Sequence, residues 1–240
     1  MAGPRNILIT GGTTGIGLAL VERLGSNHRI MTTGRTMTAR LEKLVELYPD
    51  VNFVKADFTE PHKATAVLKK ALKKAGWEKL DNAIFNAGTG IAVESQLEGA
   101  ASIRDTLDVN LTSNIALAQM LFPLLKKSRG KLTFIGSLAY RGKAGLASYA
   151  ASKAGLHGFA RALREEWRGK VFVQILHLGA TKTGMHEKAG LNVGIIKHFF
   201  TSARTMAAMI DKSIAGSRFS VKLSFFQDWT GATFLARGLR

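Results

Sequence analysis

Cysteine is absent from the 240 residues, and acidic residues are scarce. The lack of cysteine excludes disulfides, thiolate metal sites and cysteine nucleophiles, and it fits a reducing compartment. No apolar run approaches the roughly 20 residues that a membrane-spanning helix needs. These absences favour a soluble protein whose chemistry uses groups other than thiols.

The shortage of acid leaves a large positive charge, because 17 acidic residues face 34 lysines and arginines and the formal net charge is +17. Such a surplus attracts polyanions, so nucleic acid, anionic lipid and acidic proteins are all compatible with it. The basic residues are nevertheless spread along the whole chain and are not interleaved with aromatic residues as in an RNA-stacking module. We therefore favour a solvated basic surface, with neither nucleic acid nor membrane as a partner.

Length and composition suit one folded unit, since 46% of the residues are hydrophobic and can form a full core. Residues 1–5 run directly into an apolar segment with no leader-like pattern. We expect residues 1–240 to form a single cytoplasmic domain.

Short apolar runs alternate with longer amphipathic segments, as they do where crossover helices connect parallel strands. Strands are expected at residues 5–10, 30–34, 51–57, 80–86, 131–137, 171–178 and 219–225. Helices are expected at 16–24, 39–47, 61–75, 102–127, 148–168 and 201–215. This pattern predicts an α/β fold: a doubly wound parallel sheet, or Rossmann fold, of about seven strands with helices on both faces.

A glycine-rich turn follows the first expected strand and reads TGGTTGIG over residues 10–17. It opens into a helix, whose amide dipoles favour the pyrophosphate of a dinucleotide. Glycines permit backbone angles and close approaches that other residues obstruct. An ordinary structural turn is an equally good interpretation of this motif alone. The candidate cofactor contacts here are Gly11, Thr13, Thr14, Gly15, Ile16 and Gly17.

Tyr149 and Lys153 lie four residues apart on an expected helix, so their side chains share one face. A phenol with a pKa of about 10 is a poor base, but a nearby ammonium favours the phenolate. We expect Lys153 to activate Tyr149, which would give a proton to a forming alkoxide or take one from an alcohol. Ser137, at the end of the strand expected at 131–137, would bind the substrate oxygen. Each residue alone has an ordinary structural explanation, and only the joint spacing favours catalysis.

The turn spacing T-G-x-x-x-G-x-G and the Ser, Tyr-x-x-x-Lys set resemble the short-chain dehydrogenase/reductase family over residues 6 to about 185. The resemblance implies a nicotinamide-dependent oxidoreductase. It implies that Asn110 is a fourth active-site member, whose backbone kink helps to hold a proton-relaying water. It also implies cofactor contacts after the third and fourth strands, where a helix cap and a plain turn are the alternatives. Those contacts are Asp57, Phe58, Asn86, Ala87 and Gly88.

The residues after the second expected strand bear on the choice of cofactor. An acid that binds ribose hydroxyls is expected there in NAD enzymes, but this chain has Arg35. A guanidinium grips an adenosine 2′-phosphate well, and the Thr36 hydroxyl adds a donor. Some family members carry a further basic residue before the middle glycine of the turn, where this chain has Thr14. We expect NADP(H), with NAD(H) as the alternative.

The segment after the sixth expected strand reads HLGATKT over residues 177–183, and the family usually has Pro-Gly and then a nicotinamide-binding Thr here. Leu178 stands at the proline position, and Gly179, Thr181 and Thr183 stay candidate cofactor contacts. Residues 185–200 are expected to form a substrate lid. His177 and His186 are best read as ordinary core or loop histidines, and we predict no metal site.

The favoured function is NADP(H)-dependent reduction of a ketone or aldehyde, for example a 3-oxoacyl thioester or a specialised-metabolite carbonyl. An NAD-dependent alcohol dehydrogenase and a non-catalytic cofactor sensor are the alternatives. The helices expected at 102–127 and 148–168 resemble those with which family members form homo-dimers and homo-tetramers. Basic residues for docking an acidic acyl-carrier protein would be Lys126, Lys127, Arg129, Arg164 and Arg168.

Overall fold

A computed structural model describes residues 3–179, 181–182 and 201–224, and within them seven strands form one parallel sheet. The spatial order is β3-β2-β1-β4-β5-β6-β9, so the chain runs outward from β1 in one direction and then returns to build the other half. This confirms the predicted doubly wound sheet. The strands are β1 (Asn6–Ile9), β2 (Arg29–Gly34), β3 (Val51–Lys55), β4 (Asn82–Phe85), β5 (Lys131–Ser137), β6 (Phe172–Leu178) and β9 (Ser220–Leu223).

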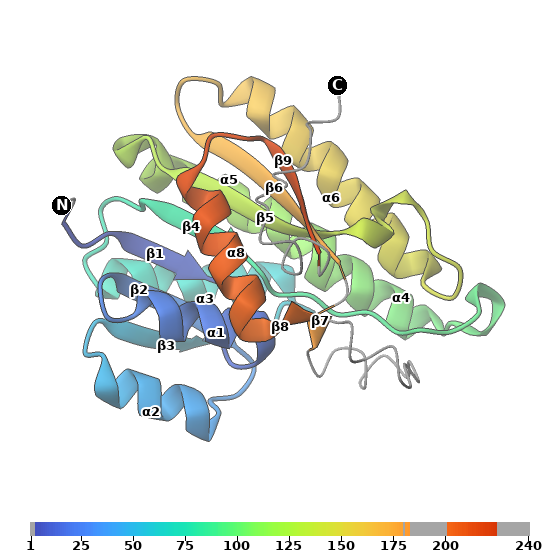
Figure 1. Cartoon of the computed structure of the whole chain (residues 1–240), viewed down its shortest axis with the longest axis horizontal. Coiled ribbons are helices and arrows are strands. Elements are labelled where there is room, and N and C mark those ends of the chain that lie inside the picture. Colours follow the sequence, from blue (N-terminus) through green and yellow to red (C-terminus); the bar gives the residue numbers. More distant parts are fainter. Residues whose placement is uncertain (1–2, 180, 183–200, 225–240) are drawn as a thin grey trace.

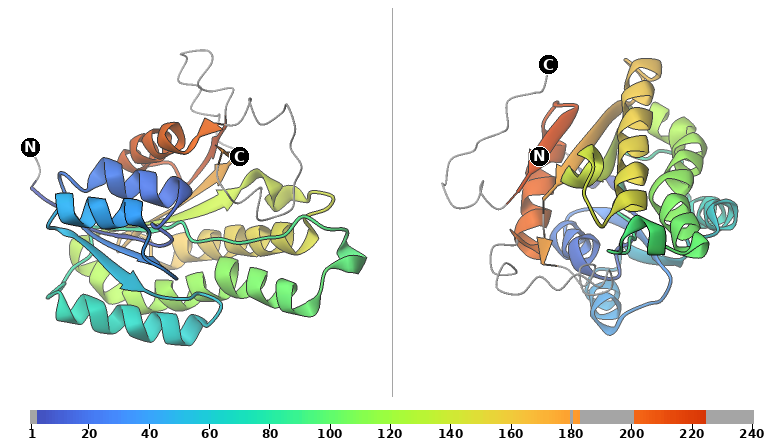
Figure 2. Two further views of the ribbon diagram at one scale, coloured as in Figure 1. Left: turned by 90° about the horizontal axis from the view of Figure 1, so that it is seen from below. Right: turned by 90° about the vertical axis from the view of Figure 1, so that its right-hand side faces the viewer.

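Helices cover both faces of the sheet, as Figures 1 and 2 show. One face carries α1 (Gly15–Leu24), α2 (Ala39–Leu47) and α8 (Ala203–Ala215). The other face carries α3 (Pro61–Lys74), α5 (Ser113–Ser128) and α6 (Ala147–Glu166), with α4 (Ala100–Leu107) packed against α6. The sheet is therefore the middle of three layers, and its central strands are buried on both sides.

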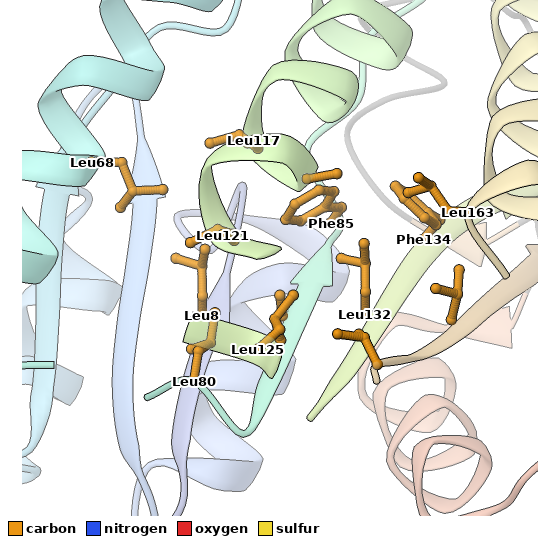
Figure 3. Close-up of a cluster of buried hydrophobic side chains, with 14 of the residues drawn as sticks. Leu8, Leu68, Leu80, Phe85, Leu117, Leu121, Leu125, Leu132, Phe134 and Leu163 are labelled. Carbon is orange, nitrogen blue, oxygen red and sulfur yellow. The ribbon is translucent and has the colours of Figure 1, made fainter. Parts of the chain in front are cut away.

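The larger of the two cores lies between the sheet and α3, α5 and α6 (Figure 3). Leucines repeat along α5 at Leu117, Leu121 and Leu125, so one helical stripe faces the sheet. Phe85 and Phe134, from the neighbouring strands β4 and β5, meet edge to face with ring centroids 5.4 Å apart. This packing fixes the two strands whose carboxyl ends carry candidate site residues.

The prediction of a single helix over residues 102–127 is wrong, because a five-residue π-helix interrupts this segment. This segment, η2 (Asp108–Thr112), separates α4 from α5. Side chains from the first turn of α5 satisfy its carbonyls: Ser113 Oγ donates to Val109 O at 2.8 Å, and Asn114 Nδ2 donates to Asn110 O at 2.9 Å. The wider turn thus has local hydrogen bonds that periodicity does not reveal, and such turns are frequent at functional sites.

The helix expected at 201–215 begins two residues later than predicted. Thr201 and Ser202 form a short strand β8 (Thr201–Ser202) that pairs with β7 (Thr181–Lys182). Ser202 then caps α8, since its Oγ accepts from Thr205 N at 3.0 Å. The cap ends the strand and starts the helix, which explains the shift.

Candidate active site

The glycine-rich turn lies between the end of β1 and the start of α1, with φ of +70° at Gly11 and +56° at Gly15. These left-handed angles favour glycine, which has no Cβ to obstruct them. A Cβ added to Gly17 would lie 2.1 Å from the Gly11 carbonyl oxygen, so the helix start and the turn backbone touch. The Thr14 side chain makes no cap hydrogen bond, and the first turn of α1 holds no acid. The turn therefore fits the pyrophosphate of a dinucleotide, for which the helix N-terminus supplies amide donors.

Side chains from neighbouring strand ends hold this turn in place. Asn86 Nδ2 donates to Thr10 O and to Gly11 O, both at 3.1 Å, while Thr10 Oγ1 accepts from the amides of Asn86 and Ala87 at 3.0 Å. Thr33 Oγ1 accepts from Gly11 N at 3.3 Å, and Thr38 Oγ1 donates to the Thr13 carbonyl at 2.9 Å. Asn86 and Ala87 thus lie directly against the turn.

The remaining candidates in the turn have different surroundings. Thr14 is exposed, whereas Ile16 packs against the hydrophobic core on the α1 side. The Thr13 side chain packs against the end of β2, because a Cβ added to Gly34 would come within 2.3 Å of the Thr13 methyl carbon. Sequence reasoning missed the anchoring threonines Thr10, Thr33 and Thr38; their one visible signal was a hydroxyl side chain beside each strand end.

Arg35 and Thr36 follow β2 directly and are exposed. Arg35 shares the lining of an open hollow of about 310 Å³ with Lys55, Asp57 and Lys63. Asp57 does not cap the following helix: its Oδ1 accepts from Thr59 N at 3.0 Å, and Glu60 is the residue before α3. The Phe58 ring is buried in the core, so any contact that Phe58 makes to a cofactor would come from its main chain.

Ser137 ends β5, and the phenol of Tyr149, in the first turns of α6, lies near its hydroxyl, which lowers the pKa of the phenol. The Ser137 hydroxyl also accepts from Ala139 N at 3.2 Å. The Tyr149 ring packs against the loop that follows β4, because a Cβ added to Gly90 would come within 2.6 Å of Tyr149 Cδ2. The structure therefore brings together the serine and tyrosine that the sequence paired.

Lys153 lies one helical turn beyond Tyr149 and is only 4% exposed. Its Nζ donates to Ile135 O at 3.0 Å and is 5.7 Å from the centroid of the Tyr149 ring. Burial lowers the pKa of Lys153 to about 8. The three catalytic candidates thus lie close together, and their catalytic roles stay a prediction.

The pKa of Tyr149 shifts in the direction opposite to the one we expected. Burial raises the pKa of the Tyr149 phenol above 10, and the hydrogen bond with Ser137 acts in the opposite direction. Desolvation dominates the shift, and the Lys153 ammonium, from which we expected an attraction, loses hydration at the same depth. Spacing correctly placed the two groups near each other, but burial determines the shift.

Asn110 is fully buried in the π-helix and connects three segments. Its Oδ1 accepts from Thr89 N at 2.9 Å, and its Nδ2 donates to Thr89 O at 2.7 Å and to Ser152 Oγ at 3.0 Å. Gly88 lies between this amide and the lysine: an added Cβ would be 3.2 Å from Asn110 Oδ1 and 3.6 Å from Lys153 Nζ. The backbone kink is therefore present, while the water relay stays a prediction.

At the end of β6, Leu178 is buried where the family usually has proline, and Gly179 N donates to Leu223 O at 2.7 Å. Pairing with β9 thus holds this turn without the rigid proline angle. The Thr181 hydroxyl donates to Gly179 O at 3.2 Å, so its proton is used in the local turn. Thr183 and the lid expected at 185–200 lie outside the described residues.

The basic residues suggested for carrier docking lie away from the site. They end or follow α5 and α6, just before β5 and β6 begin. Ser137 lies at the opposite, carboxyl end of β5, so their position gives carrier docking no support. Within the described ranges, no three His, Cys, Asp or Glu side chains are placed to hold a metal ion. Nor does any helix in that part of the chain have the length and apolar character to cross a membrane.

Comparisons with known proteins agree with this geometry. Residues 5–194 match the family described as short chain dehydrogenase. A Dictyostelium discoideum protein named dehydrogenase/reductase SDR family protein 7-like is 30% identical over 195 residues, which cover 75% of this chain and 60% of that protein. The chain thus spans about three fifths of that relative's length. A 3-oxoacyl-(acyl-carrier-protein) reductase of Buchnera aphidicola is 30% identical over 186 residues, 74% of each chain.

Among solved structures, a short-chain dehydrogenase from Sphingobium yanoikuyae in complex with NADPH superposes with a TM-score of 0.80. It shares 24% sequence identity, and the match covers 91% of this chain and 87% of that one. The sheet order and the turn after β1 define a dinucleotide-binding α/β protein. Together with the family match, they show that the chain belongs to the short-chain dehydrogenase/reductase family.

Proposed function

We propose that the protein reduces a ketone or aldehyde with NADPH. The observation that carries this proposal is the proximity of Ser137 and Tyr149, with Lys153 one helical turn away. This pair lies at the same edge of the sheet as the glycine-rich turn, because parallel strands end together. A bound dinucleotide would therefore reach from the turn toward the two hydroxyls.

Ser137 and Tyr149 each have a defined part in the proposed reduction. The reduced nicotinamide, when bound, supplies the hydride that adds to the carbonyl carbon. Ser137 holds the carbonyl oxygen by a hydrogen bond, and Tyr149 transfers its phenolic proton to that oxygen as the alcohol forms. A phenol is protonated at neutral pH, and the raised pKa of Tyr149 favours that form further, which is the form that reduction needs.

Cations near the end of β2 support NADP(H) as the cofactor. Arg35 is exposed there, and it lines the same hollow as Lys55 and Lys63. A guanidinium binds a phosphate with two parallel hydrogen bonds, which a ribose hydroxyl cannot match. The Sphingobium relative bound to NADPH adds support by analogy of fold.

The test combines cofactor binding with turnover of a carbonyl panel that includes a 3-oxoacyl thioester. We expect NADPH fluorescence to change on mixing, and Tyr149→Phe to abolish turnover while the NADPH dissociation constant stays the same. Tyr48→Phe, the same change at the end of α2, is the matched control and should retain full activity. Unchanged turnover in Tyr149→Phe would contradict the mechanism, and absent NADPH binding would contradict the function.

The substrate, a cytoplasmic location and a homo-oligomeric assembly stay predictions. The Buchnera relative's name suggests acyl thioesters as one class to test. An alcohol dehydrogenase using NAD and a cofactor sensor are the other outcomes of the same experiments. The sensor would bind the dinucleotide without turning over any substrate.

A further inference from the structure

Two histidines and a tyrosine form a stacked cluster behind Ser137, and the proposed reaction does not use them. His177 on β6 is fully buried, and His157 lies on α6. The rings of Tyr140 and His177 stack with centroids 4.1 Å apart, and His157 lies 5.1 Å from His177. Tyr140 belongs to the short turn η3 (Leu138–Arg141), which follows Ser137 directly.

Hydrogen bonds connect this cluster to the main chain of Ser137. His157 Nδ1 lies 3.0 Å from His177 Nε2, and His177 Nδ1 lies 3.3 Å from Ser137 O. The Ser137 carbonyl can only accept, so His177 donates from Nδ1. A neutral His177 ring then accepts at Nε2, and His157 must donate from its own Nδ1. The chain therefore has one direction, from His157 through His177 to Ser137.

The surroundings keep this chain in its neutral form. The pKa of His177 is lowered to about 4, mainly by burial and then by His157, Lys222 and Lys153, while the Ser137 carbonyl acts in the opposite direction. Burial and Arg161 lower the pKa of His157 as well. Both rings are thus uncharged near neutral pH, where the direction of the two hydrogen bonds is defined.

Packing leaves the His177 ring little freedom. Gly136 and His177 are register partners on β5 and β6, and a Cβ on Gly136 would come within 2.8 Å of His177 Nδ1. Tyr140 stacks on the ring from the turn after Ser137. The ring therefore lies against Gly136, just before Ser137, and against Tyr140, in the turn that follows Ser137.

We propose that His177 is a positioning residue for Ser137: supported by His157 and Tyr140, it fixes the Ser137 carbonyl and so aims the Ser137 hydroxyl at Tyr149. This inference rests on the proposed reductase function. The carbonyl and the hydroxyl belong to one residue at a strand end, so a displacement of the Ser137 main chain that loses the contact with His177 also moves the hydroxyl relative to the phenol. The cluster supplies no atom to the reaction.

The experiment replaces the imidazole ring of His177 and measures how catalysis that depends on Ser137 changes. His177→Leu removes the donor, and we expect kcat to fall by about 10- to 100-fold, as displacements of about 1 Å at a reacting centre do, while the NADPH dissociation constant holds. His177→Asn restores a donor near Nδ1 and should recover part of kcat. His62→Leu, the same change at an exposed position of α3, is the matched control.

Two readouts separate positioning from a merely structural role. Ser137 lowers the pKa of Tyr149, so His177→Leu should move the pH profile of alcohol oxidation to higher pH. In a Ser137→Ala background the same substitution should change neither kcat nor the profile further, because the residue through which it acts is gone. An additive loss in the double variant, or a lower melting temperature with unchanged kcat and profile, would overturn the proposal.

A readout without turnover keeps the two proposals distinguishable. In isotope-labelled protein, the ¹³C resonance of the Ser137 carbonyl should shift in His177→Leu and return toward the wild-type position in His177→Asn. If the wild-type protein reduces no substrate, the reductase function fails while this shift still supports positioning. A resonance that stays in place in His177→Leu overturns positioning whether or not the enzyme is active.

Discussion

At the scale of single residues, the site combines two kinds of position that respond to different physical forces. Arg35 is exposed and acts through its charge, whereas Lys153 is almost fully buried and pays a desolvation penalty for its charge. Substitutions at the two positions are therefore expected to change different quantities. Arg35 should determine which dinucleotide binds, and Lys153 should determine how the folded state responds to pH.

Replacing Arg35 by aspartate should reverse the cofactor preference. The carboxylate would repel the 2′-phosphate of NADPH and could accept from the ribose hydroxyls of NADH. Loss of a charged hydrogen bond of about 1.5–3 kcal/mol corresponds to a roughly 10- to 100-fold weaker NADPH complex. Dissociation constants for both dinucleotides measure this. Lys43→Asp, an equal charge change at an exposed position of α2, should leave the ratio of the two constants unchanged. A similar shift in both variants would assign the effect to net charge and contradict a local role for Arg35.

Lys153 makes stability depend on pH with a definite sign. Its pKa is about 8 when folded and near 10.5 when unfolded, so between these values the unfolded chain binds the extra proton. The free energy of unfolding should therefore rise with pH in that window by about 1.4 kcal/mol per pH unit from this group. Urea unfolding from pH 7.5 to 9.5 should show the rise in wild type relative to Lys153→Met. Parallel curves for the two proteins would contradict the buried ammonium.

At the scale of elements, Gly17 of α1 and Gly158 of α6 are both helical glycines, but they have opposite surroundings. A Cβ on Gly17 of α1 would lie 2.1 Å from a backbone oxygen of the turn, whereas a Cβ on Gly158 of α6 meets nothing within 4 Å. The first glycine is needed for close packing of a helix against its own turn. The second only adds freedom to the unfolded chain.

The pair provides a matched test of the glycine-rich turn. Gly17→Ala should lower the free energy of unfolding by about 1–3 kcal/mol and weaken NADPH binding, because the turn backbone must move. Gly158→Ala should raise the free energy of unfolding by about 0.5–1 kcal/mol without affecting the cofactor. Chemical denaturation and NADPH titration of both variants measure this. Normal NADPH binding by Gly17→Ala would show that the turn does not hold the cofactor.

Elements set by local pattern could be predicted from the sequence, and features set by long-range contacts could not. The apolar runs of five to eight residues and the glycine spacing identified the seven strands of the main sheet and the turn, because each signal lies within one element. The π-helix at Asn110 depends on side-chain bonds from the next turn, and Thr33 reaches the Gly11 amide from another strand. The shift in the pKa of Tyr149 depends on how deeply the phenol is buried, which the helical spacing of the residues does not reveal.

At the scale of the whole molecule, the net positive charge should help to attract anionic ligands to the site. The net charge is +17, and the few exposed acids are partly used in ion pairs such as Arg23 with Asp211 at 2.7 Å, between α1 and α8. Such exposed pairs contribute little to stability. Most of the positive field is therefore uncompensated, and it should attract any anionic ligand that approaches the sheet edge where the glycine-rich turn lies.

This field predicts different salt dependences for the two dinucleotides. NADPH carries one phosphate more than NADH, and Arg35 lies where that phosphate is expected, so added salt should screen a larger attraction for NADPH. Between about 0.05 and 0.5 M NaCl, the logarithm of the NADPH dissociation constant should rise more steeply than that for NADH. In Arg35→Asp the two slopes should become similar, because the local contact is lost while the remaining charges still act on both ligands. Equal slopes in the wild-type protein would mean that the additional phosphate meets no cation, and the assignment of Arg35 to the 2′-phosphate would then fail.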